Sequence, residues 1–146
     1  MVRNIVKKSF PILRNKKISI YPLKSKNYSG GAYWFLPFWR ALFINRKRNF
    51  NEKELIGLIV HELCHFESYQ KRGWVKSILF GILYWISPRF RKKEELETEN
   101  LAVRKGYARE TYLANLRLER IKKKISKYYS TSQEIKSYAK SIGKWQ

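Results

Sequence analysis

"ELIGLIVHELCHFESYQ", residues 54–70, decides the fold, because its apolar side chains recur every three or four residues, as along one face of an α-helix. These apolar residues are Leu55, Leu58, Ile59, Leu63 and Phe66. Asn51 and Glu54 have the spacing of a capping box, which marks the start of a helix. Gly73 is a residue type that commonly ends one. We therefore expect one long helix from about Asn51 to Gly73.

The only two histidines of the chain, His61 and His65, lie four residues apart in this predicted helix. Residues at this spacing share one helix face, so both rings can reach the same metal ion, while Glu62 lies about 100° away. The alternative is a pair of hydrogen-bonded core histidines. That alternative leaves Glu62 as a buried carboxylate without a partner, which would cost several kcal/mol. The pattern therefore favours a zinc hydrolase site with Glu62 beside the metal.

A catalytic zinc ion has three protein ligands and keeps its fourth position for water, so this site needs one more ligand. Cys64 is the only cysteine and points about 100° away from its neighbour His65, so we expect it to be a small packing residue. The segment "EELETE", residues 94–99, holds four of the chain's eleven acidic residues. We expect the third ligand to come from this acidic segment.

The motif "VHELCH", residues 60–65, is preceded by "LFIN" and followed by "ELETENLAVRKG", residues 95–106. Together these segments resemble the gluzincin branch of the zincin metallopeptidases, and especially its small members, the minigluzincins. The resemblance covers about residues 18–107. It implies that Glu95 is the third zinc ligand. It also implies that Glu99 accepts a hydrogen bond from the ring N–H of His61 that is not used for the metal.

The same resemblance has two departures in the acidic segment. Thr98 stands where the family usually has Ala, and Glu99 is one methylene longer than the usual Asp. Glu94 or Glu99 could therefore replace Glu95 as the ligand. Glu97, Ala102 and Gly106 fall where the family pattern often has the same residues.

The fold that we expect is α+β and zincin-like, with a short three-stranded sheet packed on the active-site helix and a C-terminal helical part that carries the third ligand. Three runs rich in β-branched and aromatic residues predict the strands: residues 18–23, 32–36 and 40–45. Pro22 and Pro37 restrict their strands to sheet edges or strand ends.

The rest of the chain is expected to be helical. Pro88 breaks the chain before a second helix over residues 92–106, and a ragged helical period then continues to about Tyr129. A second capping box, Thr131 with Glu134, predicts a last short helix. We expect a single domain over residues 1–146, with a core at about 18–107 and a basic helical extension at 108–146.

The function that this pattern implies is hydrolysis of peptide bonds. A zinc ion polarises the scissile carbonyl and lowers the pKa of a water to about 7, and Glu62 acts as the general base. The strand "ALFIN", residues 41–45, resembles the zincin edge strand that pairs with an extended substrate. A tyrosine is expected to stabilise the oxyanion, but ten tyrosines give no means of choosing one.

The tail offers a means of restraining this activity. Some small members of the resembled family are latent because their own C-terminal segment blocks the cleft. Apolar residues of the tail could cover the cleft in the same way, with completion of the core as the alternative. These are Tyr128, Tyr129, Ile135, Tyr138, Ile142 and Trp145.

The net charge of +21 predicts acidic partners, such as nucleic acid or an anionic membrane surface, in addition to a peptide or protein substrate. The rival to the peptidase is therefore a basic, zinc-stabilised protein that binds nucleic acid or a membrane surface without peptidase activity. A purely structural zinc site has no need of Glu62, which favours the enzyme. The basic residues of 117–127 most often mark a solvated helix face rather than a nucleic-acid surface.

One apolar segment, "WVKSILFGILYWI", residues 74–86, raises the question of membrane contact. It is too short to span a bilayer, which takes about 20 residues, so we expect a helix buried on the domain. The alternative is a helix lying on an anionic bilayer, flanked by Lys and Arg. With one cysteine and no cleavable signal peptide, we expect a cytoplasmic protein, with peripheral membrane attachment as the alternative.

Overall fold

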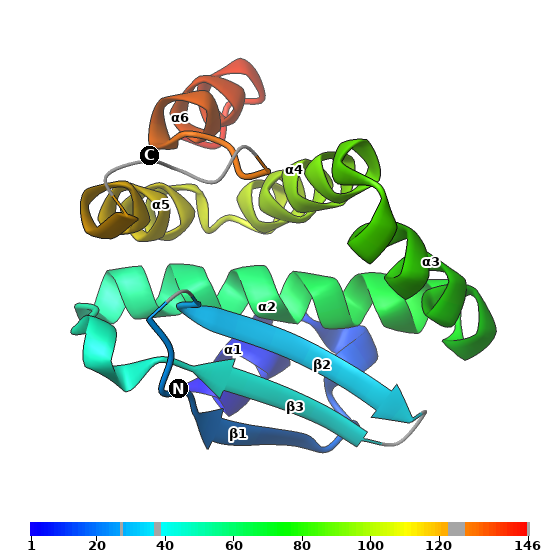
Figure 1. The fold of residues 1–146 in the computed structure, drawn as a ribbon. Coiled ribbons are helices and arrows are strands. Elements are labelled where there is room, and N and C mark those ends of the chain that lie inside the picture. The colour runs from blue at the N-terminus through cyan, green and yellow to red at the C-terminus, as the bar shows by residue number, and fades with distance from the viewer. Residues whose placement is uncertain (27, 37–38, 123–127, 146) are drawn as a thin grey trace.

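The structure, a computed structural model, describes residues 1–26, 28–36, 39–122 and 128–145. This part of the chain forms an α+β fold, with six α-helices and one three-stranded mixed sheet (Figure 1). The helices are α1 (Val2–Ser9), α2 (Glu52–Arg72), α3 (Trp74–Ile86), α4 (Pro88–Arg104), α5 (Ala108–Lys122) and α6 (Ser132–Ser141). Two short 3₁₀ turns, Pro11–Leu13 and Arg46–Arg48, precede the sheet and α2.

The sheet consists of β1 (Ile18–Pro22), β2 (Gly30–Leu36) and β3 (Trp39–Ile44), close to the three predicted strands. Its order is β1-β3-β2, with β3 parallel to β1 and antiparallel to β2. The expectation that residues 41–45 form an edge strand is therefore wrong. Ala41 and Leu42 are fully buried in the middle of the sheet, and β2 is the edge strand that packs on α2. Pro22 ends an edge strand as predicted, whereas Pro37 lies outside the described residues.

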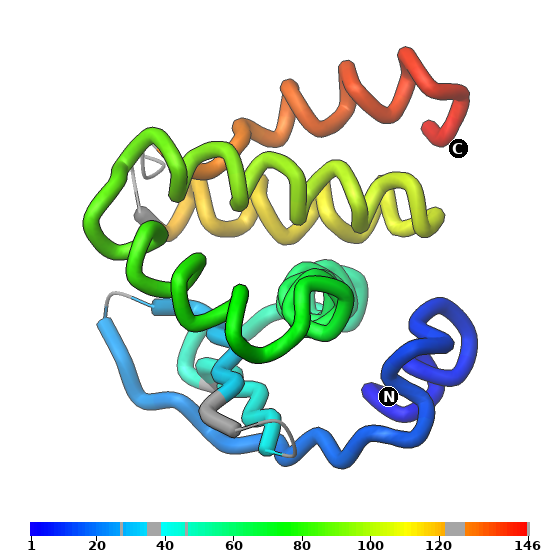
Figure 2. The backbone as a smooth tube through the Cα atoms, turned by 90° about the vertical axis from the view of Figure 1, so that its right-hand side faces the viewer, coloured from blue at the N-terminus to red at the C-terminus, as the bar shows by residue number. Residues whose placement is uncertain are grey.

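Helix α2 occupies the centre of the molecule, between the sheet on one side and α4 and α5 on the other (Figure 1). Figure 2 shows it almost end-on, with α1 beside it. Apolar residues of α2 such as Leu63 and Phe66 share one core with Leu42 of the sheet and with Ile5 and Val6 of α1. The sequence did not predict α1, because only one narrow face of this short basic segment is apolar. It nevertheless completes the core under α2.

The predicted starts of α2 and α6 depend on their capping boxes, and both capping boxes are confirmed. The backbone N–H of Glu54 donates to the Asn51 side chain at 2.9 Å, and that of Asn51 donates to the Glu54 carboxylate at 2.9 Å. Thr131 and Glu134 form the same reciprocal cap at the start of α6. Gly73 ends α2 with a φ of 80°, which an L side chain rarely adopts. The helical period predicted up to Tyr129 crosses residues 123–127, which lie outside the described residues.

Helix α3 begins directly after Gly73, at the end of α2, and leads at an angle to the start of α4 (Figure 1). No residue of α3 is buried, so the expectation of a helix buried on the domain is wrong. Helix α4 begins at Pro88 rather than at residue 92, because Ser87 caps it and Pro fits the first helical turn. The two helices α3 and α4 are thus separated by a single residue.

The C-terminal helix α6 packs on α4 and α5, on their side away from α2 (Figure 1). Its Ile135 and Ala139 are buried with Val103 of α4 and Ala108 of α5 in a second core cluster. The alternative that these residues complete the core is therefore the one that the structure supports for α6. Helix α6 is packed against the core helices instead of covering the cleft described below, whereas Tyr129, which precedes it, lines that cleft. Latency stays a prediction.

Candidate metal centre

Three side chains from two helices meet at the middle of α2. The Nε2 atom of His61 lies 3.2 Å from Oε2 of Glu95 on α4, and the Nε2 atom of His65 lies 3.7 Å from the same oxygen. One potential ligand atom of each residue lies within 4.8 Å of the other two. Glu95 and His65 are buried, and His61 is nearly so. These are the two predicted histidine ligands and the carboxylate that the resemblance implies.

The arrangement fits a zinc ion on two grounds. Bonds of 2.0–2.2 Å to a tetrahedral zinc hold neighbouring ligand atoms about 3.3 Å apart, close to the two distances found here. Oε2 of Glu95 is also buried without a hydrogen bond from any described residue, which is costly unless a cation binds it. Burial opposes ionisation of Glu95, but its contacts with His61 and His65 hold the pKa of this carboxyl well below its usual range.

The electrostatics of His61 follow from the same cluster. Burial by itself lowers the pKa of His61, but the contact with Glu95 and the nearby carboxylates of Glu62 and Glu99 outweigh it and raise the pKa to about 9. In the absence of metal, His61 therefore carries a proton at neutral pH. A metal ion must displace that proton, because only the neutral ring is a ligand.

The two other candidate carboxylates have other partners. Glu94 forms an ion pair with Arg72 at the end of α2. Glu99 is buried and accepts hydrogen bonds from the side chain of Asn115 at 2.8 Å and from the backbone N–H of Ser130 at 3.1 Å. Glu95 is thus the carboxylate that faces the histidines. The hydrogen bond from His61 to Glu99 that the resemblance implies stays a prediction.

Two residues that support the ligands were not singled out from the sequence. The hydroxyl of Tyr84 on α3 donates a hydrogen bond to Oε1 of Glu95. The other carboxylate oxygen, Oε2, faces the two histidines. Thr98 donates its hydroxyl to the backbone carbonyl of Glu94 at 2.8 Å, and its oxygen lies 3.4 Å from Nδ1 of His65. An oxygen that is already a donor can only accept from His65, which places the proton on Nδ1 and keeps Nε2 available for a metal. Thr98 was noted in the sequence only as a departure from Ala.

Glu62 lies on the neighbouring face of α2 and is buried against the start of β2. Burial raises the pKa of its carboxyl, and the two histidines and a backbone hydrogen bond from Ala32 oppose this rise. An ideal Cβ at Gly30 would come within 2.9 Å of Oε1 of Glu62 and 3.1 Å of Leu58. Glycine at position 30 therefore leaves the space that this carboxylate occupies.

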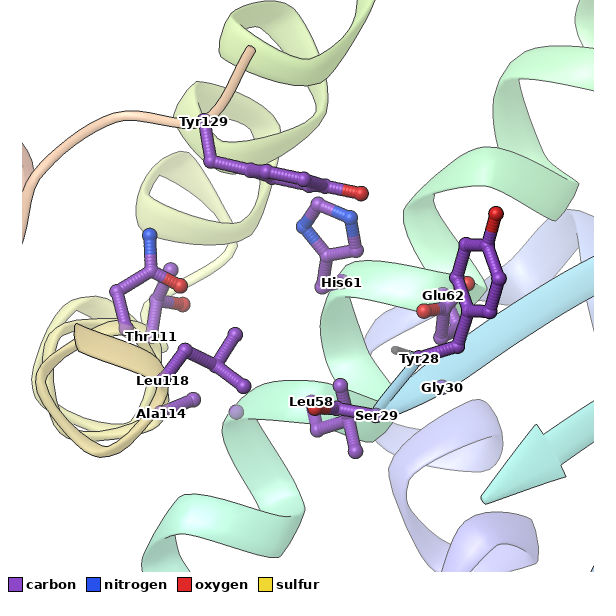
Figure 3. Close-up of a pocket in the computed structure, with 12 residues that line it drawn as sticks. Tyr28, Ser29, Gly30, Leu58, His61, Glu62, Thr111, Ala114, Leu118 and Tyr129 are labelled. Carbon is purple, nitrogen blue, oxygen red and sulfur yellow. The ribbon is translucent and has the colours of Figure 1, made fainter. Parts of the chain in front are cut away.

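The three candidate ligands and Glu62 line a cleft of about 380 Å³. Its walls are α2, the edge strand β2, the inner side of α3 and the first turns of α4. A smaller hollow of about 60 Å³ adjoins it between α2, α5 and the segment before β2. Figure 3 shows the ring of Tyr129 over the imidazole of His61, with Leu118 on one side and Gly30 on the other. No described residue of α6 lines either space.

The segment that precedes β2 is held in place by Asn45, a fully buried residue after β3. Its side-chain amide donates to the backbone carbonyls of Ser25 at 2.6 Å and Tyr28 at 2.8 Å. These bonds fix the chain where Tyr28 and Ser29 line the small hollow. Asn45 closes the quoted segment "LFIN", but its role could not be seen without the fold.

Comparison of the chain with protein-family models, with curated proteins and with solved structures gave no match. Among the described residues, no helix has both the length and the apolar character needed to cross a membrane. The arrangement of residues at the cleft is therefore the basis for a functional proposal.

Proposed function

We propose that this protein is a zinc-dependent peptidase of the gluzincin type, with His61, His65 and Glu95 as metal ligands and Glu62 as general base. The observation that carries the proposal is the buried Oε2 of Glu95, which faces two histidine nitrogens at the floor of an open cleft. The zincin-like fold belongs to the same proposal. It is supported by the central α2, the small sheet beside it and a ligand-bearing second helix.

An open cleft favours catalysis over a structural role for the metal. A structural zinc site is closed by four protein ligands, whereas a catalytic one keeps a position for water or substrate. Here the described residues supply three ligand atoms, and the cleft gives access to them. Glu62 lines the same cleft without being one of the three.

The chain's own groups divide the work of peptide hydrolysis. When bound, the zinc ion would supply Lewis-acid activation of the peptide carbonyl and of the attacking water. Glu62 takes the proton of that water and then delivers it to the leaving amine. The raised pKa of its carboxyl suits both steps, because a base whose pKa lies closer to neutrality also serves as an acid. Thr98 and Tyr84 hold the ligands in position.

Strand β2, rather than the segment 41–45, is the element suited to bind an extended peptide. It is an edge strand whose residues from Gly30 to Trp34 line the cleft. An edge strand has unpaired backbone groups that can form hydrogen bonds with a peptide laid beside it. A peptide bound there would lie across the metal ligands and Glu62.

Tyr129 is our candidate for stabilising the oxyanion. Its ring lies over His61 (Figure 3), and the two ring centroids are 6.2 Å apart. Tyr129 lines both the cleft and the smaller hollow. Tyr84 already donates its hydroxyl to Glu95. Tyr129, in contrast, lies beside His61 and accepts a hydrogen bond from Arg91, so its own O–H can donate. Burial raises the pKa of Tyr129, so it remains a hydrogen-bond donor at neutral pH.

The test combines metal analysis with a peptidase assay on a mixture of quenched fluorescent peptides. Protein purified without chelator should contain about one zinc per chain, and Glu62→Gln should keep the zinc while activity falls by about a hundredfold or more. Glu95→Gln should lose most of the zinc under the same conditions. Absence of zinc from the folded protein, or unchanged turnover in Glu62→Gln, would contradict the proposal.

A further inference from the structure

We propose that α3 is an in-plane membrane anchor that docks the protein on an anionic bilayer. Seven of its apolar residues are exposed instead of being buried in the domain. Val75, Trp85 and Ile86 are each at least 70% exposed. The exposed apolar residues of α3 are Trp74, Val75, Ile78, Leu79, Ile82, Trp85 and Ile86.

These seven side chains form one continuous face. At 100° per residue they fall within an arc of about 140° on a helical projection. The opposite side of α3 holds the contacts with the domain. Ser77 donates to the backbone carbonyls of Gly73 and Tyr69, Phe80 packs edge-on against Phe90, and Tyr84 bonds Glu95. These contacts fix the rotation of the helix. Trp74, Ile78 and Trp85, at one edge of the apolar face, also line the cleft, whereas Val75, Leu79, Ile82 and Ile86 line neither the cleft nor the smaller hollow.

The length of α3 decides how it can meet a membrane. Thirteen residues span about 20 Å, whereas the hydrocarbon core of a bilayer is about 30 Å thick. The helix is therefore too short to cross, and its amphipathic character suits the interface between headgroups and acyl chains. Trp74 and Trp85 stand at its two ends, and tryptophan is enriched at that depth of a bilayer.

The charge around α3 identifies the kind of surface that it fits. No Asp or Glu occurs between Glu67 and Glu94, a segment that contains seven Lys and Arg residues. Four exposed members of this set form no ion pair with a described residue: Lys76, Arg89, Lys92 and Lys93. Anionic lipid headgroups supply the missing negative charge. A second copy of this chain would bring a second basic set against the first, which disfavours pairing through this face.

The experiment is co-sedimentation with phosphatidylcholine vesicles that either contain or lack phosphatidylserine, at physiological salt. The full chain should bind the anionic vesicles and bind neutral ones far more weakly. Ile82→Glu, in the middle of the apolar face, should lower the partition coefficient by about tenfold or more, because a charge replaces an inserted side chain. Ile86→Glu, at the exposed end of α3, serves as a second variant with the same expected direction.

The matched control is Ile20→Glu. Ile20 is an exposed isoleucine on the edge strand β1, so this variant has the same change in charge and apolar area but lies away from α3. It should bind like the parent chain. Lys92→Glu with Lys93→Glu should weaken binding to anionic vesicles only, by about fivefold or more for each residue. Circular dichroism establishes that each variant is folded.

Three outcomes would overturn the proposal. One is a parent chain that does not bind anionic vesicles, and another is equal binding by Ile82→Glu and Ile20→Glu, which would mean that charge alone drives binding. The third is a dimer in sedimentation velocity that Ile82→Glu dissociates, which would assign the face to a second copy. The assay needs neither zinc nor turnover, and repeating it with Glu62→Gln keeps its result separate from the proposed peptidase activity.

Discussion

Glu95 differs from its acidic neighbours in the use of its two oxygens. One accepts from Tyr84, and the other faces two histidine nitrogens and has no hydrogen bond from a described residue. Glu94 is neutralised by Arg72, and Glu99 has neutral donors, Asn115 and Ser130. The three carboxylates occupy nearly the same stretch of α4, yet of the three only Glu95 presents an oxygen to both histidine nitrogens.

The protonation of His61 predicts how zinc binding depends on pH. Its pKa in the metal-free fold is raised from 6.5 to about 9, so a proton competes with zinc below that pH and the competition ends above it. We expect the apparent dissociation constant to fall by about tenfold per pH unit from pH 7 to 9 and then to level off. Competition with a chromophoric chelator at a series of pH values measures this dependence.

Glu99→Gln is the control for that titration. It removes one of the carboxylates that raise the pKa of His61 and keeps a side chain of the same shape for Asn115. The plateau should therefore begin at a lower pH than in the parent chain. Levelling of the parent curve near pH 6.5, the ordinary pKa of histidine, would show that the cluster does not hold a proton on His61.

The contact between α2 and α5 depends on Gly57, which lies in the second turn of α2. An ideal Cβ at this position would come within 2.1 Å of the backbone carbonyl oxygen of Glu110 on α5. Backbone atoms cannot move aside as a flexible side chain can, so Gly57→Ala must separate the two helices. We expect a loss of about 1–3 kcal/mol in the free energy of unfolding, measured by urea denaturation.

Gly81 of α3 offers a matched comparison in the same experiment. It too lies within a helix, but an added Cβ there meets no atom within 4 Å. Gly81→Ala should therefore stabilise the protein by about 0.5–1 kcal/mol through the better helix propensity of alanine. Equal effects of the two substitutions would contradict the close approach of α2 and α5.

The sequence predicted those parts of the fold that depend on near neighbours. The helix over residues 51–73, the capping boxes of α2 and α6, and the pairing of His61 with His65 all follow from spacing along the chain. Strand order does not follow from this spacing, because the neighbours of β3 depend on contacts between distant segments. Residues 41–45 were therefore expected in an edge strand, although β3 is the central strand. The exposure of α3 was missed for the same reason. An apolar segment has the same sequence pattern whether or not other parts of the protein pack against it.

The metal site shows the same division between local and distant information. The residues themselves left Glu94, Glu95 and Glu99 open as third ligand, and only a family resemblance favoured Glu95. What separates them is distant in sequence, because Arg72 belongs to α2 and Asn115 to α5. Tyr84, which orients Glu95, could not be distinguished from the other tyrosines without the fold.

Zinc would join α2 and α4, which are also linked by the Arg72–Glu94 ion pair and by the contact of Thr98 with His65. His65 and Glu95 come from α2 and α4, so a metal that binds them stabilises the folded chain over the unfolded one. At a free zinc concentration one hundred times the dissociation constant the gain is about 2.7 kcal/mol. For a chain of this size we expect a rise of roughly 5–10 °C in the Tm.

Thermal unfolding followed by circular dichroism, with zinc and with excess chelator, tests this expectation. Glu95→Gln provides the control, because it should unfold at the same temperature under both conditions. An identical Tm of the parent chain with zinc and with chelator would contradict a metal bridge between α2 and α4.

Tyr84 belongs to both proposed sites, since it lies on α3 and its hydroxyl bonds a ligand on α4. Two binding equilibria that share such a contact are thermodynamically linked, and the linkage is reciprocal. If a bilayer raises the affinity for zinc by some factor, zinc raises the affinity for the bilayer by the same factor. A protein built in this way can confine its active form to a surface without any further regulatory domain.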